Sequence, residues 1–213
     1  IDSAYYAQGT DNSLFAKETG DGGTAYITNV RHLQNLRTDF SGVGVGITMA
    51  EQLTDIECKE YKNNQGEGLD PNYNFIPIAN GALTSYDGKT KTISRLYVSC
   101  SGDAGLFGLV TNKIAIQRVR LFSPRIISTG GVSLLGESNA APLLARVNEE
   151  VCTLKDIEVV DGSAEGKTYI GGLVGLVNNS ASCSLENCRV YWTAPQELVQ
   201  GSDIDYKISG EYA

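Results

Sequence analysis

Two short apolar patterns alternate along the second half of the chain, and this repetition constrains the fold more than any other feature of the sequence. The first pattern is a six-residue block with a small residue at its fourth position and valine at its sixth. It occurs at Gly105–Val110, Pro142–Val147 and Gly172–Val177. The middle block departs from the other two because Pro142 and Ala145 replace both glycines. The blocks begin 37 and 30 residues apart, which indicates a repeating structural unit of about that length.

The second pattern places apolar residues at positions i, i+3 and i+5, between the blocks of the first. Its four copies are Ile93/Leu96/Val98, Ile116/Val119/Leu121, Leu154/Ile157/Val159 and Leu185/Cys188/Val190. One unit cannot bury its apolar residues alone, but stacked units place like residues over one another at about 4.8 Å per coil. The chain is therefore predicted to be all-β, a right-handed parallel β-helix built from short strands. The Gly/Ser-rich segment Ser128–Asn139 is expected to be a loop insertion that lengthens one coil.

Stacking of the second pattern also predicts an outward column of polar residues. If its copies lie in register, Tyr97, Arg120, Glu158 and Arg189 follow one another from coil to coil. The last three alternate in charge, and opposite charges on neighbouring strands contribute about 0.2–1 kcal/mol each. This column is interpreted as a ladder that sets the register and not as a catalytic cluster.

The N-terminal part has a different apolar pattern. Val30, Leu33 and Leu36 have helical spacing, and they follow Asn29, a good N-cap residue. A short helix here is expected to cover the open end of the β-helix, since unpaired strand edges favour aggregation. The lone histidine, His32, falls in this helix and is expected to be structural.

Further along, two segments are expected to be early strands, one is expected to be a surface loop and one a turn. These are Ile47–Ile56 and Asn74–Ile78 for the strands, Lys62–Asn72 for the loop, and Ser85–Gly88 for the turn.

The predicted organisation is a lead-in over residues 1–24 and one β-helix domain over residues 25–213. Within that domain we expect the capping helix in 25–40, the coils in 43–192 and a C-terminal segment in 193–213. The chain opens without a basic and then apolar leader, so we expect it to be a segment of a larger exported protein.

Composition narrows the class of function. The net charge of −8 disfavours binding to nucleic acids or to anionic membranes, and no stretch of about 18 apolar residues could span a bilayer. An odd number of cysteines, five, argues against a complete disulfide framework. They are interpreted as small buried apolar residues, with a Cys183–Cys188 bond as the alternative. We expect no metal or cofactor; the segment Gly20–Gly23 and the pair Asp203 and Asp205 are at most weak cation ligands.

These residues resemble a known family. Gly105–Val110 and Gly172–Val177 are similar to the GLUG motif of bacterial surface proteins, and Leu185–Val190 and Ile93–Val98 are similar to the strand that accompanies it. The segments 27–36 and 75–88 resemble the opening of β-helical domains in large cell-wall proteins of Gram-positive gut bacteria. The resemblance spans residues 24–192 and implies an extracellular, cell-wall or cell-surface location, an adhesin-like role and no catalytic residues.

The expected function is a non-catalytic surface module, a scaffold or ligand-presenting stalk with host or environmental glycans or proteins and flanking domains as partners. One alternative is a polysaccharide lyase or glycoside hydrolase on the same scaffold, for which the candidate carboxylates are Asp156, Glu158 and Glu186. The other is a carbohydrate-binding domain. For that role the candidate ligand-binding residues are Tyr191 and Trp192, because alternation along the strand would point one of the two rings outward.

Overall fold

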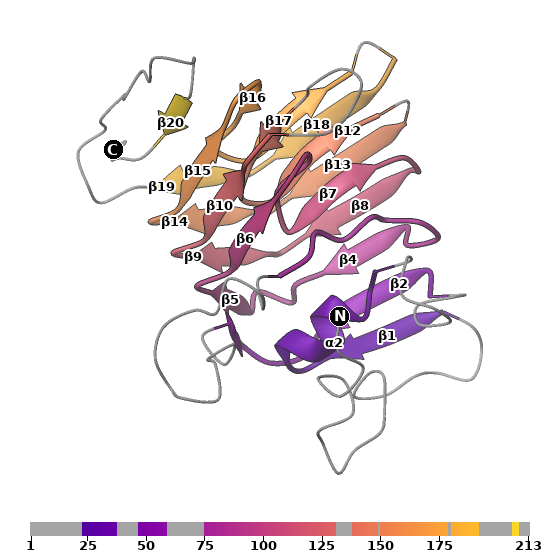
Figure 1. Ribbon diagram of the computed structural model, residues 1–213. Coiled ribbons are helices and arrows are strands. Elements are labelled where there is room, and N and C mark those ends of the chain that lie inside the picture. Colours follow the sequence, from indigo (N-terminus) through magenta and orange to yellow (C-terminus); the bar gives the residue numbers. More distant parts are fainter. Residues whose placement is uncertain are drawn as a thin grey trace.

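The chain folds into short strands arranged in stacked, mainly parallel sheets (Figure 1). The computed structural model describes residues 23–37, 47–58, 75–130, 138–148, 150–178 and 180–191, and the backbone of strand β20. Within these ranges the protein is all-β apart from the short helix α2 (Val30–Gln34). Every strand pairing is parallel except that of β20, which runs antiparallel to β15. The architecture is compatible with a parallel β-helix.

The largest sheet has six strands in the order β1-β2-β4-β8-β13-β18, so successive strands along the sheet come from successive passes of the chain. Its strands are β1 (Thr24–Ile27), β2 (Met49–Gln52), β4 (Ser85–Asp87), β8 (Ile114–Gln117), β13 (Val151–Lys155) and β18 (Ser182–Glu186). A five-stranded sheet consists of β3 (Ile56–Glu57), β5 (Thr92–Ser94), β9 (Arg120–Phe122), β14 (Glu158–Val160) and β19 (Arg189–Tyr191).

Three smaller sheets complete the stack. The four-stranded sheet consists of β6 (Tyr97–Cys100), β10 (Arg125–Ser128), β15 (Ser163–Gly166) and β20 (Tyr206–Ile208). The three-stranded sheet consists of β7 (Phe107–Val110), β12 (Leu144–Val147) and β17 (Val174–Val177). The two-stranded sheet pairs β11 (Asn139–Ala140) with β16 (Tyr169–Ile170).

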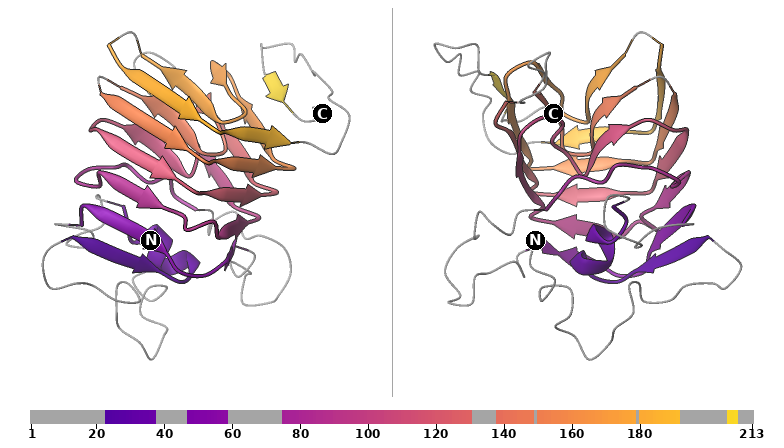
Figure 2. Two further views of the ribbon diagram at one scale, coloured as in Figure 1. Left: turned by 180° about the vertical axis from the view of Figure 1, so that it is seen from behind. Right: turned by 45° about the vertical axis from the view of Figure 1, so that its right-hand side comes forward.

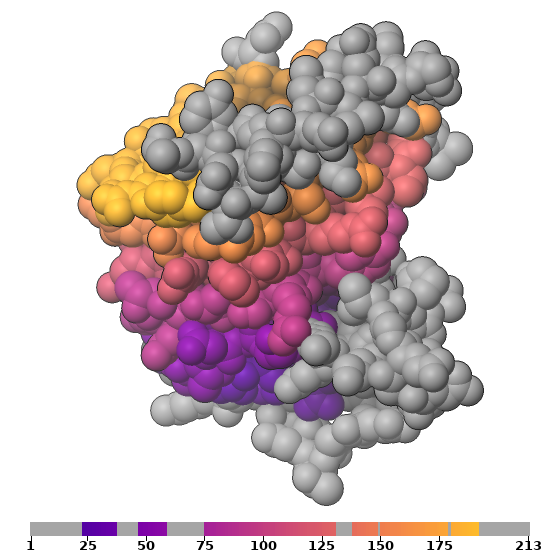
Figure 3. Space-filling model, turned by 90° about the vertical axis from the view of Figure 1, so that its left-hand side faces the viewer, coloured from indigo at the N-terminus to yellow at the C-terminus, as the bar shows by residue number. Residues whose placement is uncertain are grey.

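The chain visits these sheets in a constant order. From β8 it passes through β9, β10, β11 and β12 and returns to the six-stranded sheet at β13, and from β13 it repeats the circuit through β17 to β18. The strands therefore form walls on several sides of a common interior (Figure 2). In the space-filling view the sequence colours follow one another along the stack from indigo to yellow, as expected when each circuit lies on the one before it (Figure 3).

The predicted interior rows are present. Tyr86, Ile116, Leu154 and Leu185 are register partners on four neighbouring strands of the six-stranded sheet. The first three of these side chains are completely buried. They belong to one continuous apolar core that contains residues from almost every pass of the chain. The central prediction from the sequence repeat is thus confirmed.

The six-residue blocks also stack as predicted, because β7, β12 and β17 pair in register through Phe107, Leu144 and Val174. The block glycines allow close approach of neighbouring backbones. A Cβ atom on Gly105 would lie 2.7 Å from the carbonyl oxygen of Ala141, and one on Gly175 would lie 2.6 Å from that of Ala145. The middle block keeps the register without glycine.

The spacing i, i+3, i+5 has a backbone explanation. Strict alternation would not point Ile116, Val119 and Leu121 into the same interior. The residue between the two strands, Arg118, has φ of 53°, and the equivalent Asp156 and Asn187 have φ of 54° and 51°. A single left-handed residue turns the chain through the corner between the six-stranded and five-stranded sheets. A second left-handed corner, at Arg95, Ser123 and Asp161, follows the five-stranded sheet.

A substitution at Ser123 tests this corner geometry. Its φ is 50°, and its N–H donates to the carbonyl oxygen of Val160 at 2.7 Å. Ser123→Gly is expected to raise the free energy of unfolding by about 0.5 kcal/mol, because glycine adopts this conformation without a Cβ clash. Ser123→Val is expected to lower it by about 1–2 kcal/mol. Urea unfolding of both variants measures the difference, and equal stabilities would contradict a left-handed corner.

Two local predictions are wrong in the pass that contains Ile93: the position of a turn and the register of the polar column. The predicted turn at Ser85–Gly88 is strand β4 up to Asp87, and the turn comes afterwards at Lys89 and Thr90, both left-handed. These residues lengthen the corner: Ile93 follows Tyr86 after seven residues, whereas Leu121 follows Ile116 after five.

The predicted register of the polar column is also wrong in this pass, because Ile93, Leu96 and Val98 turn the second corner, at Arg95, whereas the other copies of the pattern turn the first. Ile93 pairs with Leu121 and not with Ile116, so Thr92 and not Tyr97 lies beside Arg120. Tyr97 instead pairs with Arg125 in the four-stranded sheet, and the guanidinium of Arg125 lies 5.9 Å from the centre of the tyrosine ring.

The N-terminal helix is present where the sequence predicts it. The side chain of Asn29 caps α2 by accepting a hydrogen bond from the N–H of His32 at 2.9 Å. Helix α2 lies beside β1 at one end of the stack (Figure 1). Strand β1 pairs with β2, so the six-stranded sheet begins before residue 43. The predicted strand at Ile47–Ile56 is divided into β2 and the start of β3, and that at Asn74–Ile78 contributes one bridge, from Ile78 to Phe107.

Candidate functional site

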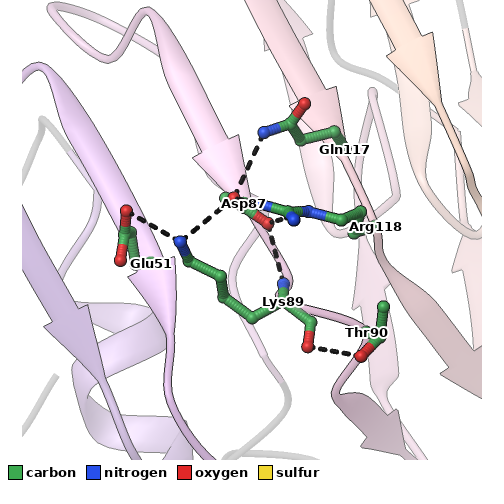
Figure 4. A network of polar contacts seen from close by, with 6 residues as sticks. All are labelled: Glu51, Asp87, Lys89, Thr90, Gln117 and Arg118. Atoms are coloured by element: carbon green, nitrogen blue, oxygen red, sulfur yellow. Dashed lines mark hydrogen bonds and ion pairs between the residues drawn. The ribbon is translucent and has the colours of Figure 1, made fainter.

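The most connected polar group of the described residues is the carboxylate of Asp87, at the corner that follows β4 (Figure 4). Arg118 donates to both oxygens of this carboxylate, with its Nε atom 3.0 Å from Oδ1. Gln117 donates to Oδ2 at 3.1 Å, and the backbone N–H of Lys89 donates to Oδ1 at 2.8 Å. The ammonium of Lys89 bridges Asp87 at 3.5 Å to Glu51 on β2 at 3.1 Å. The network thus joins three successive passes of the chain.

The electrostatics of Asp87 favour a structural role. Burial by itself would raise the pKa of this carboxyl, but the hydrogen bonds from Arg118, the Lys89 N–H and Gln117 outweigh burial and hold the pKa below its ordinary value. A carboxylate that stays ionised and has its oxygens occupied by donors is poorly suited to exchange protons with a substrate. Asp87 was not predicted as part of a polar network, because Ser85–Gly88 has the composition of a turn.

The carboxylates proposed for a catalytic alternative each have a partner. Glu158 accepts from the Nε atom of Arg120 at 2.8 Å, and Glu186 forms an ion pair with Lys155 at 2.6 Å. Asp156 accepts a hydrogen bond from the side chain of Asn187 at 2.6 Å. These contacts run between neighbouring strands, so they serve register.

The outward column of the five-stranded sheet contains Thr92, Arg120, Glu158 and Arg189 in register. The predicted alternation of charge in its last three members is therefore confirmed. Beside it, two residues along each strand, lies a second outward column made of Ser94, Phe122, Val160 and Tyr191.

Tyr191, a predicted ligand-binding residue, is 38% exposed and Phe122 is 39% exposed. Trp192, the other predicted residue, lies outside the described part of the chain. Phe122 was not predicted, although its place one residue after the buried Leu121 indicates that its ring points outward.

None of the five cysteines is joined in a disulfide, so the alternative of a Cys183–Cys188 bond is not observed. Cys183 is instead the register partner of Cys152 on the neighbouring strand. The Cys152 thiol is hydrogen-bonded to Cys183, which raises the pKa of Cys152 and lowers that of Cys183. Cys58 and Cys152 are buried, as the sequence predicts, whereas the other three are partly exposed.

Other residues considered as ligands are accounted for. His32 is 4% exposed, and its Nδ1 atom lies 3.0 Å from the hydroxyl of Thr28 within the turn that begins α2. Asp203, Asp205 and residues 20–22 lie outside the described ranges. Within those ranges no group of three or more His, Cys, Asp or Glu side chains has the arrangement of a metal site. No helix there is long and apolar enough to cross a membrane.

The last described pass leaves its interior rows partly uncovered. Leu185 is 56% exposed and Val177 is 38% exposed, although their register partners Leu154 and Val147 are completely buried. The comparisons with known proteins assign no role to this end or to either outward column: no family model, curated protein or solved structure matches the chain.

Proposed function

We propose that the chain is a right-handed parallel β-helix, closed at its N-terminal end by α2, that serves as a non-catalytic scaffold or adhesin-like module on a bacterial cell surface. The constant order in which the chain visits its sheets supports the β-helix. Right-handedness follows from the strong preference of crossovers between parallel strands for that hand. The buried Leu33 and Leu36, at and just beyond the end of α2, support its role as a cap.

The pairing of outward charges is the observation that favours a scaffold over an enzyme. Carboxylates that could act on a glycosidic bond are instead joined to cations on neighbouring strands, as in Glu158 with Arg120 and Glu186 with Lys155. An inverting glycosidase needs two carboxylates about 6.5–9.5 Å apart on opposite sides of the bond, with one able to donate a proton. Ion pairs that link one coil to the next contribute to a regular, rigid rod. A rod of this kind suits the display of ligands or of other domains.

The resemblance to GLUG-motif proteins of Gram-positive bacteria supports the extracellular location. The stacking of Gly105–Val110 on Pro142–Val147 and of that block on Gly172–Val177 is what such a repeat requires. We therefore expect the protein to be exported and held at the cell wall, with glycans or proteins of the host or the environment as its partners.

Two assays on the purified chain test this proposal together. Beads coated with the chain are expected to adhere to host-cell or plant-cell-wall surfaces more than beads coated with Leu154→Asp, a variant whose buried charge should unfold the stack. The same preparation, incubated with mixed plant polysaccharides, is expected to release neither reducing sugars nor unsaturated products above the blank. Product release that increases with protein concentration and is lost in Glu158→Gln would overturn the non-catalytic assignment.

A further inference from the structure

The outward face of the five-stranded sheet carries an arrangement that the scaffold role leaves unexplained. We infer that this face binds an extended glycan in which acidic sugars alternate with neutral ones. The inference rests on the proposed surface-adhesin function and names the ligand class and the face that binds it. The face comprises β9, β14 and β19, which lie on one another in the stack (Figure 1).

The second outward column, which contains Phe122, Val160 and Tyr191 and is called the aromatic column below, supplies a surface on which sugar rings can stack. Phe122 and Tyr191 are both more than a third exposed, on strands that flank β14, and Val160 lies between them. Exposed apolar side chains that adjoin one another and are bordered by polar residues are a feature of ligand-binding surfaces. Two strand spacings separate the rings, which is about 9.6 Å. This separation is comparable to the length of two sugar units in an extended glycan, so a chain lying along the stack can place one sugar on each coil.

The charged column gives the face its selectivity. Arg120, Glu158 and Arg189 lie beside the aromatic column with charges in the order plus, minus, plus. Arg120 and Glu158 have side chains that are 48% and 36% exposed, so their ion pair at 2.8 Å is open to competition from a ligand. A guanidinium favours a carboxylate, and a carboxylate accepts hydrogen bonds from hydroxyl or amide groups. The column therefore complements acidic sugars at its two ends and a neutral sugar in the middle.

Arg189 is the better placed of the two cations. Its Nη1 atom lies 3.5 Å from the hydroxyl oxygen of Tyr191, the one hydrogen-bond contact of its side chain within the described residues. Most of its donors are thus available, next to an exposed ring. A sugar stacked on Tyr191 would place its carboxylate within reach of this guanidinium. The net charge of −8 opposes an anionic ligand only weakly, because charges beyond about 8 Å are largely screened at physiological ionic strength.

Isothermal titration of the full chain with a hyaluronan hexasaccharide tests the inference, because that oligosaccharide alternates uronic acid with an N-acetylated neutral sugar. We expect saturable binding that weakens as salt is raised. Tyr191→Ala and Phe122→Ala should each weaken binding at least about tenfold, or about 1.4 kcal/mol, because each loses stacking and apolar contact. Arg189→Gln should weaken it by a similar factor and remove much of the salt dependence. Phe122→Tyr, which keeps a ring, should restore binding.

Tyr169→Ala is the matched control, since this tyrosine is 46% exposed but lies on β16 in the two-stranded sheet. Its affinity should equal that of the unchanged chain, and circular dichroism should show that all variants remain folded. Cellohexaose, a neutral glycan, should bind at least about tenfold more weakly than the hyaluronan hexasaccharide. Absence of binding, equal binding of cellohexaose, or equal loss of affinity in Tyr169→Ala would each overturn the inference. Continued bead adhesion alongside any of these results would leave the scaffold function standing.

Discussion

Leu154→Ala is expected to lower the free energy of unfolding by about 2–5 kcal/mol, whereas Leu185→Ala should lower it by about 1 kcal/mol or less. The two leucines are register partners in one interior row. Leu154 is completely buried between the passes that carry Ile116 and Leu185, and its truncation leaves a cavity. Leu185 is 56% exposed, so most of its side chain already contacts water.

Urea unfolding followed by circular dichroism measures both effects under the same conditions. Because the substitution and the row are identical, the comparison isolates the cover that one further pass of the chain provides. An Ile116→Ala variant serves as a second buried member of the row and should resemble Leu154→Ala. If Leu185→Ala cost as much as Leu154→Ala, the uncovered end of the stack would be covered in solution.

Asp87→Asn should lower the free energy of unfolding by about 2–3 kcal/mol at pH 7, because it removes the charge from a buried group that accepts several hydrogen bonds. The Asp87 side chain is 8% exposed, and its pKa lies below that of an unfolded aspartate. Its stabilising contribution is therefore complete above the unfolded pKa of about 3.9 and is lost as the pH falls through the folded pKa.

The pH dependence separates this explanation from simple loss of packing. The unfolding free energies of the unchanged chain and of Asp87→Asn should begin to converge below about pH 4, where the unfolded aspartate takes up a proton, and should meet only once the pH falls below the lowered pKa of the folded state. Glu158→Gln is the control, because it removes a carboxylate from a half-exposed ion pair and should cost less than about 1 kcal/mol. A gap between the two proteins that stays constant from pH 7 to pH 3 would contradict the electrostatic role of Asp87.

Local spacing carried most of the information about the interior rows. The i, i+3, i+5 pattern predicted that Ile116, Leu154 and Leu185 share a row, and the six-residue blocks predicted how β7, β12 and β17 pair. These predictions succeeded because each pass must bury its own apolar residues over those of the pass before, so every copy of the pattern has the same apolar spacing. The left-handed corner was implicit in the odd spacing of the pattern, although the sequence alone did not identify the residue responsible.

Contacts between passes decided the rest. Thr92 and not Tyr97 lies beside Arg120, because the copy of the pattern at Ile93 turns the second corner, at Arg95, and the apolar spacing is the same at both corners. The pairing of Cys152 with Cys183 joins residues about 30 positions apart in sequence, and so do the hydrogen bonds from Arg118 to the carboxylate of Asp87. The outward columns arise in the same way. Their members are unremarkable one at a time, and only the stacking distance of parallel strands brings Phe122, Val160 and Tyr191 onto one face.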